Sequence, residues 1–378
     1  MNGFLELHES SRSSRLGWLP TAVMVLASCA VPIGALAGDH AFPASAEQPQ
    51  AGDFPATRPP AADFVTWRFT WDNDVVVKSD NEFSNGFTLQ VHGPPAATWA
   101  DAAGTPAFGK SMARWFLPVR RQDLLFREGW SAGQSLQTPD DLTRKDLIVD
   151  DVPYAAVLAV QNTWIAYDDR RLYGFGWLLG VMGPAALGKE VQTGFHKLIG
   201  GEKPMGWDNQ LHNEPLINFY YEQKRKLVRS SFGDIAVGVG ASLGNLVTAA
   251  EVRLEGRLGW HVPGGFLYTP DPIGRHLTYD SHLPPRVPAN WALYGSVSAG
   301  AMLLGHVAFF DGNLFRDSHS VDYDRTVENV MFGLHFQRWR WGIHLNLASS
   351  SKVVDRVSDS KDTFGTVMVE FRHGARSR

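Results

Sequence analysis

Regular alternation of aromatic and polar side chains is the feature that most constrains the fold of this chain. In the segment VTWRFTWD, the side chains of Trp67, Phe69 and Trp71 share one face of an extended chain, and the residues between them are polar. A half-buried strand of a soluble protein would alternate in the same way. Three aromatic residues on one face are more typical of a barrel wall that faces lipid, so the segment predicts a membrane strand.

Similar segments recur along most of the chain, separated by turns and polar loops. No apolar run beyond the N-terminal region is long enough for a transmembrane helix, and the net charge of -4 argues against nucleic acid as a partner. We expect an all-β fold, a transmembrane antiparallel β-barrel of about 12 strands with a short helix in an extracellular loop. The expected strands are 64–72, 87–92, 130–138, 154–167, 172–182, 215–227, 232–243, 248–261, 291–310, 324–339, 340–348 and 363–372.

The N-terminal region has the pattern of a secretion signal. Two arginines precede the apolar stretch LGWLPTAVMVLASCAVPIGALA, which ends in Ala35-Leu36-Ala37. We therefore expect a signal peptide over 1–37, a flexible N-terminal segment over 38–61 and the barrel domain over 62–378.

Two alternatives stay open for this region. Cleavage after Ala44-Ser45-Ala46 would also follow a small-x-small pattern. The run that ends in Cys29, Leu-Ala-Ser-Cys, is similar to a bacterial lipobox, in which the cysteine would carry a lipid anchor. Since Cys29 is the only cysteine, a chain cleaved after it would contain no disulfide.

One polar island, residues 183–214, interrupts the strands with the sequence GPAALGKEVQTGFHKLIGGEKPMGWDNQLHNE. Its composition predicts a short helix over 187–199, followed by two glycines that end it. On that helix Gln192 and His196 lie four residues apart and share a face. A histidine at a helix end can be merely a partner of the helix dipole. Glu202 favours a functional site instead, because a nearby carboxylate can orient a histidine or hold a metal beside it.

A second polar cluster lies early in the chain, where Asn73-Asp74 is followed by Ser84-Asn85-Gly86. Asx and Asn-Gly turn chemistry in a hairpin would account for these residues. Their oxygen atoms are also the ligands that Ca²⁺ prefers. A third pattern, G-x-S-x-G at 129–133, matches a nucleophile elbow, but it lies in a strand-like stretch with no following helix and does not predict a serine hydrolase.

Strand parity brings the two polar clusters to one end of the barrel. If both termini are periplasmic, the first, third and fifth connections all open on the outer face. These connections hold Asn73-Asp74, the charged loop DDLTRKDLIVDDVP and the polar island. A long excursion over 262–290 falls on the periplasmic side, where short turns are usual, and nothing in its sequence accounts for its length.

These motifs resemble the lipid A deacylase LpxR family. The resemblance rests on FTWDNDVVVKSDNEFSNGFTLQ, QTPDDLTRKDLIVDDVPYAAVL and the polar island, in that order; the C-terminal third is only generically barrel-like. It implies a twelve-stranded barrel of the Gram-negative outer membrane, which we expect to be a monomer. It also implies Ca²⁺-dependent ester hydrolysis that removes the 3′-linked acyloxyacyl group of lipid A, in a site that faces the outer leaflet of lipopolysaccharide.

The resemblance also implies roles for individual residues. His196 would act as general base on a water molecule, and Gln192 would steady the histidine or the water. Arg144 and Lys145 would attract the phosphates or sugar acids of the substrate. One residue departs from the family pattern, because Pro204 stands where the family has a tyrosine, and this puts the details of substrate contact in doubt. The residues that would supply or support the calcium oxygens are Asn73, Asp74, Ser84 and Glu202.

Three questions stay open at this point. The sequence does not decide which of Asp74 and Glu202 binds Ca²⁺ and which orients His196. The same machinery in an outer-membrane phospholipase is an alternative function. A channel or adhesin barrel without catalysis is the alternative from a different class.

Overall fold

The alternating segments form the wall of a closed antiparallel barrel in the computed structural model, which describes residues 64–73, 83–270, 274–351, 353–354 and 363–374. The barrel order is β1-β14-β13-β12-β11-β8-β7-β6-β5-β4-β3-β2, so the predicted number of strands and the predicted fold class are confirmed. The wall strands are β1 (Phe64–Asn73), β2 (Phe83–His92), β3 (Leu125–Gln137), β4 (Ala155–Tyr167), β5 (Arg171–Met182), β6 (Glu214–Arg229), β7 (Gly233–Gly244), β8 (Val247–Trp260), β11 (Trp291–Val307), β12 (Thr326–Arg338), β13 (Trp341–Ser350) and β14 (Thr363–Gly374).

Alternate side chains point out of the barrel and into its lumen, as the sequence of β1 predicts. Trp67 and Phe69 are exposed on the outer wall, while Arg68 between them is buried in the lumen. Residues 1–63, which include the predicted signal peptide and the flexible segment, lie outside the described part of the chain. Within the described residues, no helix combines the length and the apolar character needed to cross a membrane.

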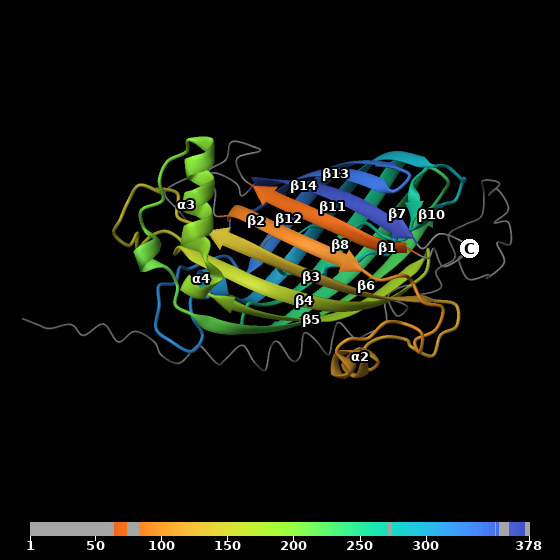
Figure 1. Ribbon diagram of the computed structural model, residues 1–378, viewed down its shortest axis with the longest axis horizontal. Helices are drawn as coiled ribbons and strands as arrows, with labels where there is room; N and C mark the ends of the chain where they lie inside the picture. Colours follow the sequence, from red (N-terminus) through yellow and green to blue (C-terminus); the bar gives the residue numbers. More distant parts are fainter. Residues whose placement is uncertain (1–63, 74–82, 271–273, 352, 355–362, 375–378) are drawn as a thin grey trace, which may run out of the picture.

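The connections at the two ends of the barrel differ in character. At one end, here called the α3 end, the β5–β6 connection carries the short 3-10 helices η3 (Pro184–Ala186) and η4 (Trp207–Asn209) and the helix α3 (Gly188–Ile199). The short helix α4 (Ala308–Asp311) lies at the same end. The opposite end, called the α2 end, carries the β2–β3 connection with α2 (Ala107–Ala113) (Figure 1).

The long β8–β11 connection folds into the lumen. We call the described residues of this connection, 262–270 and 274–290, the lumen insert; it contains the two short paired strands β9 (Pro263–Gly264) and β10 (Leu283–Pro285). Asp280 of the insert forms ion pairs with Arg68 of β1 at 2.9 Å and with Arg127 of β3 at 2.5 Å. The insert therefore joins β8 to β11 by way of the lumen, where it is paired with the wall, and this accounts for a connection longer than a turn.

The opposite side of the wall holds the lumen insert through main-chain carbonyls. Lys224 of β6 donates a hydrogen bond to the carbonyl oxygen of Leu267, and Arg257 of β8 donates one to that of Gly265. Buried charged groups are tolerated in a protein interior when they are paired and hydrogen-bonded, and the lumen meets that condition by contacting the insert on several sides.

Candidate active site

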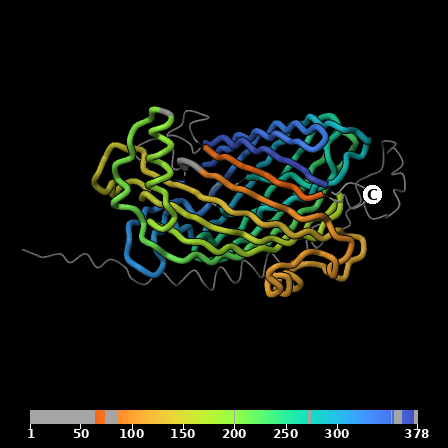
Figure 2. The backbone as a smooth tube through the Cα atoms, in the orientation of Figure 1, coloured from red at the N-terminus to blue at the C-terminus, as the bar shows by residue number. Residues whose placement is uncertain are grey.

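The polar island forms the largest structured element at the α3 end, and its helix matches the prediction closely. The expected helix over 187–199 is α3, preceded by η3, with Leu187 as its N-cap in a left-handed conformation. Gly200, at φ 74°, ends α3, because a glycine adopts this left-handed conformation without a steric penalty. The amide of Gly201 then donates a hydrogen bond to the carbonyl of His196. In Figure 2 the helix rises from the end of the barrel (left).

His196 lies in the last turn of α3 with a half-buried ring. Its Nδ1 atom is 2.6 Å from the main-chain carbonyl oxygen of Glu202. A carbonyl oxygen can only accept, so this hydrogen bond places the proton of the neutral ring on Nδ1 and leaves Nε2 as the basic nitrogen. The side chain of Glu202 is exposed. The orienting contact from Glu202 is thus made by its main chain, whereas the sequence suggested its carboxylate.

Gln192 lies one turn before His196 and is almost fully buried, at 2% exposure. Its Oε1 accepts a hydrogen bond of 2.8 Å from Nε1 of Trp207, and its Nε2 has no hydrogen-bond partner among the described residues. The indole of Trp207 packs against the ring of Tyr154, with the ring centroids 5.0 Å apart. Trp207 therefore fixes the amide of Gln192, a role that its position in the sequence did not reveal.

The charged β3–β4 loop lies directly against the island. The amide of Met205 donates a hydrogen bond to the carbonyl of Leu142, and the side chain of Asn209 donates one to the carbonyl of Lys145. Arg144 and Lys145 are both exposed on this loop. Their positive charges are thus held at the same end of the barrel as His196, as strand parity predicted.

Tyr154 joins the loop to the island from the position just before β4. Its hydroxyl donates a hydrogen bond of 3.3 Å to the carbonyl of Leu142, and its carbonyl accepts one from the amide of Leu211. Burial raises the pKa of Tyr154 to about 12. The phenol therefore stays protonated near neutral pH and acts as a structural donor.

The early polar cluster has only part of the expected structure. Asn73 is the last residue of β1, is buried, and pairs with Asn85 of β2. Ser84 and Asn85 continue β2 as extended strand, so the interpretation of Ser84-Asn85-Gly86 as a turn is wrong. The ladder between β1 and β2 reaches two residues further than expected, and pairing on both sides of β2 overrides the turn preference of Asn-Gly. Asp74 and the side chain of Ser84 lie outside the described part of the structure.

The two polar clusters are connected through the wall. Asn85, opposite Asn73, is itself opposite Leu136 of β3, and Leu136 belongs to the same apolar cluster as Trp207. Neighbouring strands are about 4.8 Å apart, which places β1 roughly 10 Å from the strand that supports the island. The end of β1 and α3 thus lie on neighbouring parts of one rim.

The described donors fit a hard cation only in part. The side chain of Asn73 carries an amide oxygen and that of Glu202 a carboxylate, both of the oxygen type that Ca²⁺ prefers. The described residues include no group of three or more His, Cys, Asp or Glu side chains that could hold a metal ion. The remaining predicted carboxylate, Asp74, is outside the described residues.

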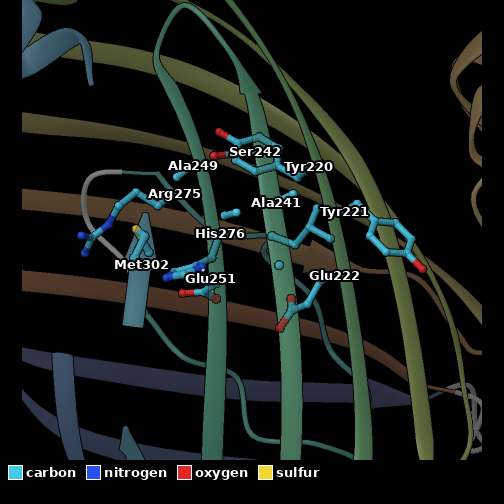
Figure 3. Close-up of a pocket in the computed structure, with 13 residues that line it drawn as sticks. Tyr220, Tyr221, Glu222, Ala241, Ser242, Ala249, Glu251, Arg275, His276 and Met302 are labelled. Atoms are coloured by element: carbon cyan, nitrogen blue, oxygen red, sulfur yellow. Dashed lines mark ion pairs between the residues drawn. The ribbon is translucent and has the colours of Figure 1, made fainter. Parts of the chain in front are cut away.

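A second histidine site inside the lumen has a different chemistry. Figure 3 shows His276 of the lumen insert beside Glu251 of β8, with its Nδ1 atom 3.1 Å from the carboxylate. Nε2 of the same ring lies 2.8 Å from a guanidinium nitrogen of Arg253, which can only donate. Both ring nitrogens are therefore engaged, and His276 has no free basic nitrogen for catalysis.

The G-x-S-x-G pattern lies within β3, as predicted, and forms no nucleophile elbow. Ser131, its central residue, accepts a hydrogen bond of 2.9 Å from the hydroxyl of Thr278 in the lumen insert. The serine is a structural contact between the wall and the insert.

Comparisons with known proteins identify the barrel. A family model described as "Outer membrane protein LpxR" matches residues 29–373. Among solved structures, LpxR from Salmonella typhimurium aligns with a TM-score of 0.62 and 16% sequence identity, covering 81% of this chain and 99% of that chain. At this identity the structural likeness shows the shared fold alone.

Other solved barrels align more weakly. The translocator domain of the autotransporter NalP from Neisseria meningitidis has a TM-score of 0.36 and 9% identity, and covers 96% of this chain and 100% of that chain. The beta domain of the Bordetella autotransporter BrkA has a TM-score of 0.37 and 7% identity, and covers 83% and 99%. No curated protein matches the chain.

Proposed function

We propose that this chain, which belongs to the LpxR family of outer membrane proteins, removes the 3′-linked acyloxyacyl group from lipid A by ester hydrolysis. The observation that carries this proposal is the state of His196. Its ring is half exposed at the end of the barrel, and the carbonyl of Glu202 leaves Nε2 free to accept a proton. With the α3 end directed outward, this nitrogen would meet the head groups of the outer leaflet, where lipid A resides.

The proposed reaction uses water as nucleophile. Nε2 of His196 takes a proton from a water molecule as the water oxygen attacks the ester carbonyl carbon. When the tetrahedral intermediate collapses, the bond to the sugar oxygen breaks, and the imidazolium returns the proton to that leaving oxygen. The carbonyl of Glu202 holds the Nδ1 proton throughout and stabilises the positive ring between the two steps.

The remaining residues position the substrate and the histidine. Gln192, fixed by Trp207, supports the turn of α3 that precedes His196. Arg144 and Lys145 project from the adjoining loop, where they would bind the phosphates or sugar acids of lipid A.

Calcium is the cofactor that we propose for this site. Asn73, Asp74, Ser84 and Glu202 would hold the ion, with one of the two carboxylates as a direct ligand. Bound there, Ca²⁺ would polarise the ester carbonyl and offset negative charge in the transition state.

Mass spectrometry of lipid A tests the reaction. Cells that express the protein should lose the mass of one acyloxyacyl group from lipid A relative to cells without the gene, and EGTA added to the purified protein should abolish hydrolysis. Unchanged lipid A together with newly formed lysophospholipid would overturn the proposal in favour of a phospholipase. Full activity in EGTA would overturn the role of Ca²⁺.

A further inference from the structure

The connection between β2 and β3 covers part of the outer wall of the barrel. We call residues 93–124 the wall cover. It leaves the rim at the α2 end and folds back along the outside of the strands, so that α2 lies beside β5 (Figure 1). Phe116 stacks on Phe175 of β5 with the ring centroids 4.4 Å apart, and Phe108 stacks on Trp177 at 5.8 Å.

The cover fits closely on this wall. The backbone of α2 approaches the wall at Gly109, where an added Cβ atom would lie 2.4 Å from the indole of Trp164. Lys110 donates hydrogen bonds to the carbonyls of Ala100 and Ala102, which folds the cover onto itself. The cover is therefore a packed element rather than a loose loop.

A polar pair beneath the cover explains why it must stay in place. Glu128 of β3 and Asn162 of β4 point to the outside, since their neighbours Arg127 and Gln161 point inward and contact the lumen insert. Asn162 donates a hydrogen bond of 3.0 Å to the carboxylate of Glu128, and both residues are buried.

The cover supplies a further donor to this pair. The amide of Thr105 donates a hydrogen bond of 3.2 Å to the carboxylate of Glu128. A carboxylate open to lipid on a barrel wall would be costly, so the cover replaces lipid over this polar patch. Its own outer surface then takes the place of the wall.

That outer surface combines large aromatic side chains with positive charges. Trp115 is 86% exposed and Phe108 57% exposed. Phe108 stacks on Trp177 of β5, and Trp115 precedes Phe116, which stacks on Phe175 of the same strand. Arg114 and Arg120 are exposed on the same segment. Tryptophan beside arginine at the edge of an apolar wall is the composition of a membrane interface, where the rings enter the acyl boundary and the cations meet phosphates.

We propose that the wall cover is an interfacial anchor that binds anionic phospholipid. Trp115 and Phe108 insert at the acyl boundary, and Arg114 and Arg120 bind head-group phosphates. The surface is continuous with the lipid-facing wall, which is why lipid is the occupant. The inference rests on the proposed function only in naming the leaflet. The proposed function directs the α3 end outward, and α2 at the opposite end would then contact the periplasmic leaflet.

Spin labelling of the full chain in vesicles tests the insertion. The only cysteine is removed with Cys29→Ser, and a nitroxide is attached at Trp115→Cys in vesicles of phosphatidylcholine with phosphatidylglycerol. Ser320→Cys, exposed in the β11–β12 connection, serves as the aqueous control, and Leu254→Cys, exposed on the outer wall of β8, serves as the lipid control.

The collision frequency of the nitroxide at Trp115→Cys with oxygen should be similar to that at Leu254→Cys. Its collision frequency with a water-soluble nickel complex should be several-fold lower than that at Ser320→Cys. A label at position 115 as accessible to nickel as at position 320 would overturn the anchor. Protection that appears only after a periplasmic extract is added would overturn it in favour of a protein partner.

The charge of the bound lipid is tested separately. Native mass spectrometry of the detergent-released wild type should retain phosphatidylglycerol several-fold over phosphatidylcholine, and Arg114→Gln combined with Arg120→Gln should remove that preference. Equal retention of the two lipids by the wild type would overturn the phosphate contacts. Neither experiment involves hydrolysis of lipid A, so the anchor and the proposed deacylase activity can fail independently.

Discussion

His196 at the α3 end and His276 in the lumen show two uses of the same residue in one barrel. The ring of His196 is half exposed and is held through one nitrogen by a main-chain carbonyl, so the other nitrogen can exchange a proton. The ring of His276 lies between Glu251 and Arg253, with both nitrogens engaged. His276, which lies beside a carboxylate, is therefore not the catalytic candidate, whereas His196, which has a free ring nitrogen, is.

The same contrast separates the two regions as a whole. The lumen is held by buried ion pairs between the wall and the insert, while the α3 end is held mainly by hydrogen bonds to main-chain carbonyls and by packing around Trp207. Charge in the lumen serves stability, and we expect charge at the α3 end to serve the substrate. The insert also crosses the lumen from β3 to β8, which argues against a passive channel.

The largest effect on stability should come from breaking the lumen network. Asp280→Asn would remove the carboxylate shared by Arg68 and Arg127 and leave two buried guanidinium groups with fewer partners. We expect the free energy of unfolding to fall by about 3–5 kcal/mol. Denaturant unfolding of the detergent-solubilised barrel measures this.

The matched control is an ion pair on the island. Asp208→Asn removes the partner of Lys189, and because both side chains of that pair are exposed, the unfolding midpoint should not change. Equal losses in the two variants would break the proposed contrast between lumen and island.

Acidification should weaken the α2 end through Asp169. Burial raises the pKa of this carboxyl, but the positive charges of Lys226 and Arg286 lower it by a larger amount, and the resulting pKa is about 2. Because the pKa is lower in the folded state than in the unfolded state, the ionised carboxylate stabilises the fold at pH values above its unfolded pKa of about 4. This contribution is lost as the pH falls to the folded pKa of about 2.

The expected loss between pH 5 and pH 2 is roughly 2 kcal/mol from this group. Denaturant midpoints at a series of pH values measure it. Asp169→Asn should lower stability at pH 5, and the difference from the wild type should shrink toward pH 2. A difference that stays constant with pH would contradict the assigned ion pairs.

A smaller effect is expected from the support of α3. Trp207→Phe keeps an aromatic ring in the cluster but leaves Oε1 of Gln192 buried without its donor, at a cost of about 1–2 kcal/mol. We expect kcat for deacylation to fall roughly tenfold with little change in KM, because the substrate contacts of Arg144 and Lys145 remain. Trp341→Phe, on the exposed wall, is the control. An unchanged kcat would show that Gln192 does not depend on Trp207.

Most of the barrel could be predicted from the sequence, because a period of two is visible in strands such as β1 and polar turns separate the segments. Parity then placed Arg144 and His196 at one end without any knowledge of contacts. The helix over 187–199 was also predictable, since Gly200 and Gly201 mark its end. The position of the lumen insert could not be predicted, because its partners Arg68 and Arg127 lie far away in sequence. In addition, the polar residues that line a lumen have the same pattern as the polar face of any half-buried strand.

Two details of the site could not be predicted for a different reason. The contact that orients His196 is made by the main-chain carbonyl of Glu202, and main-chain atoms leave no signature in the residue type. The role of Trp207 could not be predicted either, because its hydrogen bond to Gln192 depends on how the island folds back on itself. The extended conformation of Asn85 follows from its pairing with Leu136 of β3, which outweighs local turn preference, and Ser84 lies at the register shift between Phe83 and Asn85.

The most direct test of the central claim compares the two histidines in one assay. Purified wild type, His196→Gln and His276→Gln are incubated with lipid A and Ca²⁺, and the released acyloxyacyl acid is quantified by mass spectrometry. We predict that His196→Gln lowers the rate by about 10²–10⁴-fold while the barrel stays folded, and that His276→Gln keeps the wild-type rate per folded molecule. A folded His196→Gln variant with the wild-type rate would contradict the account.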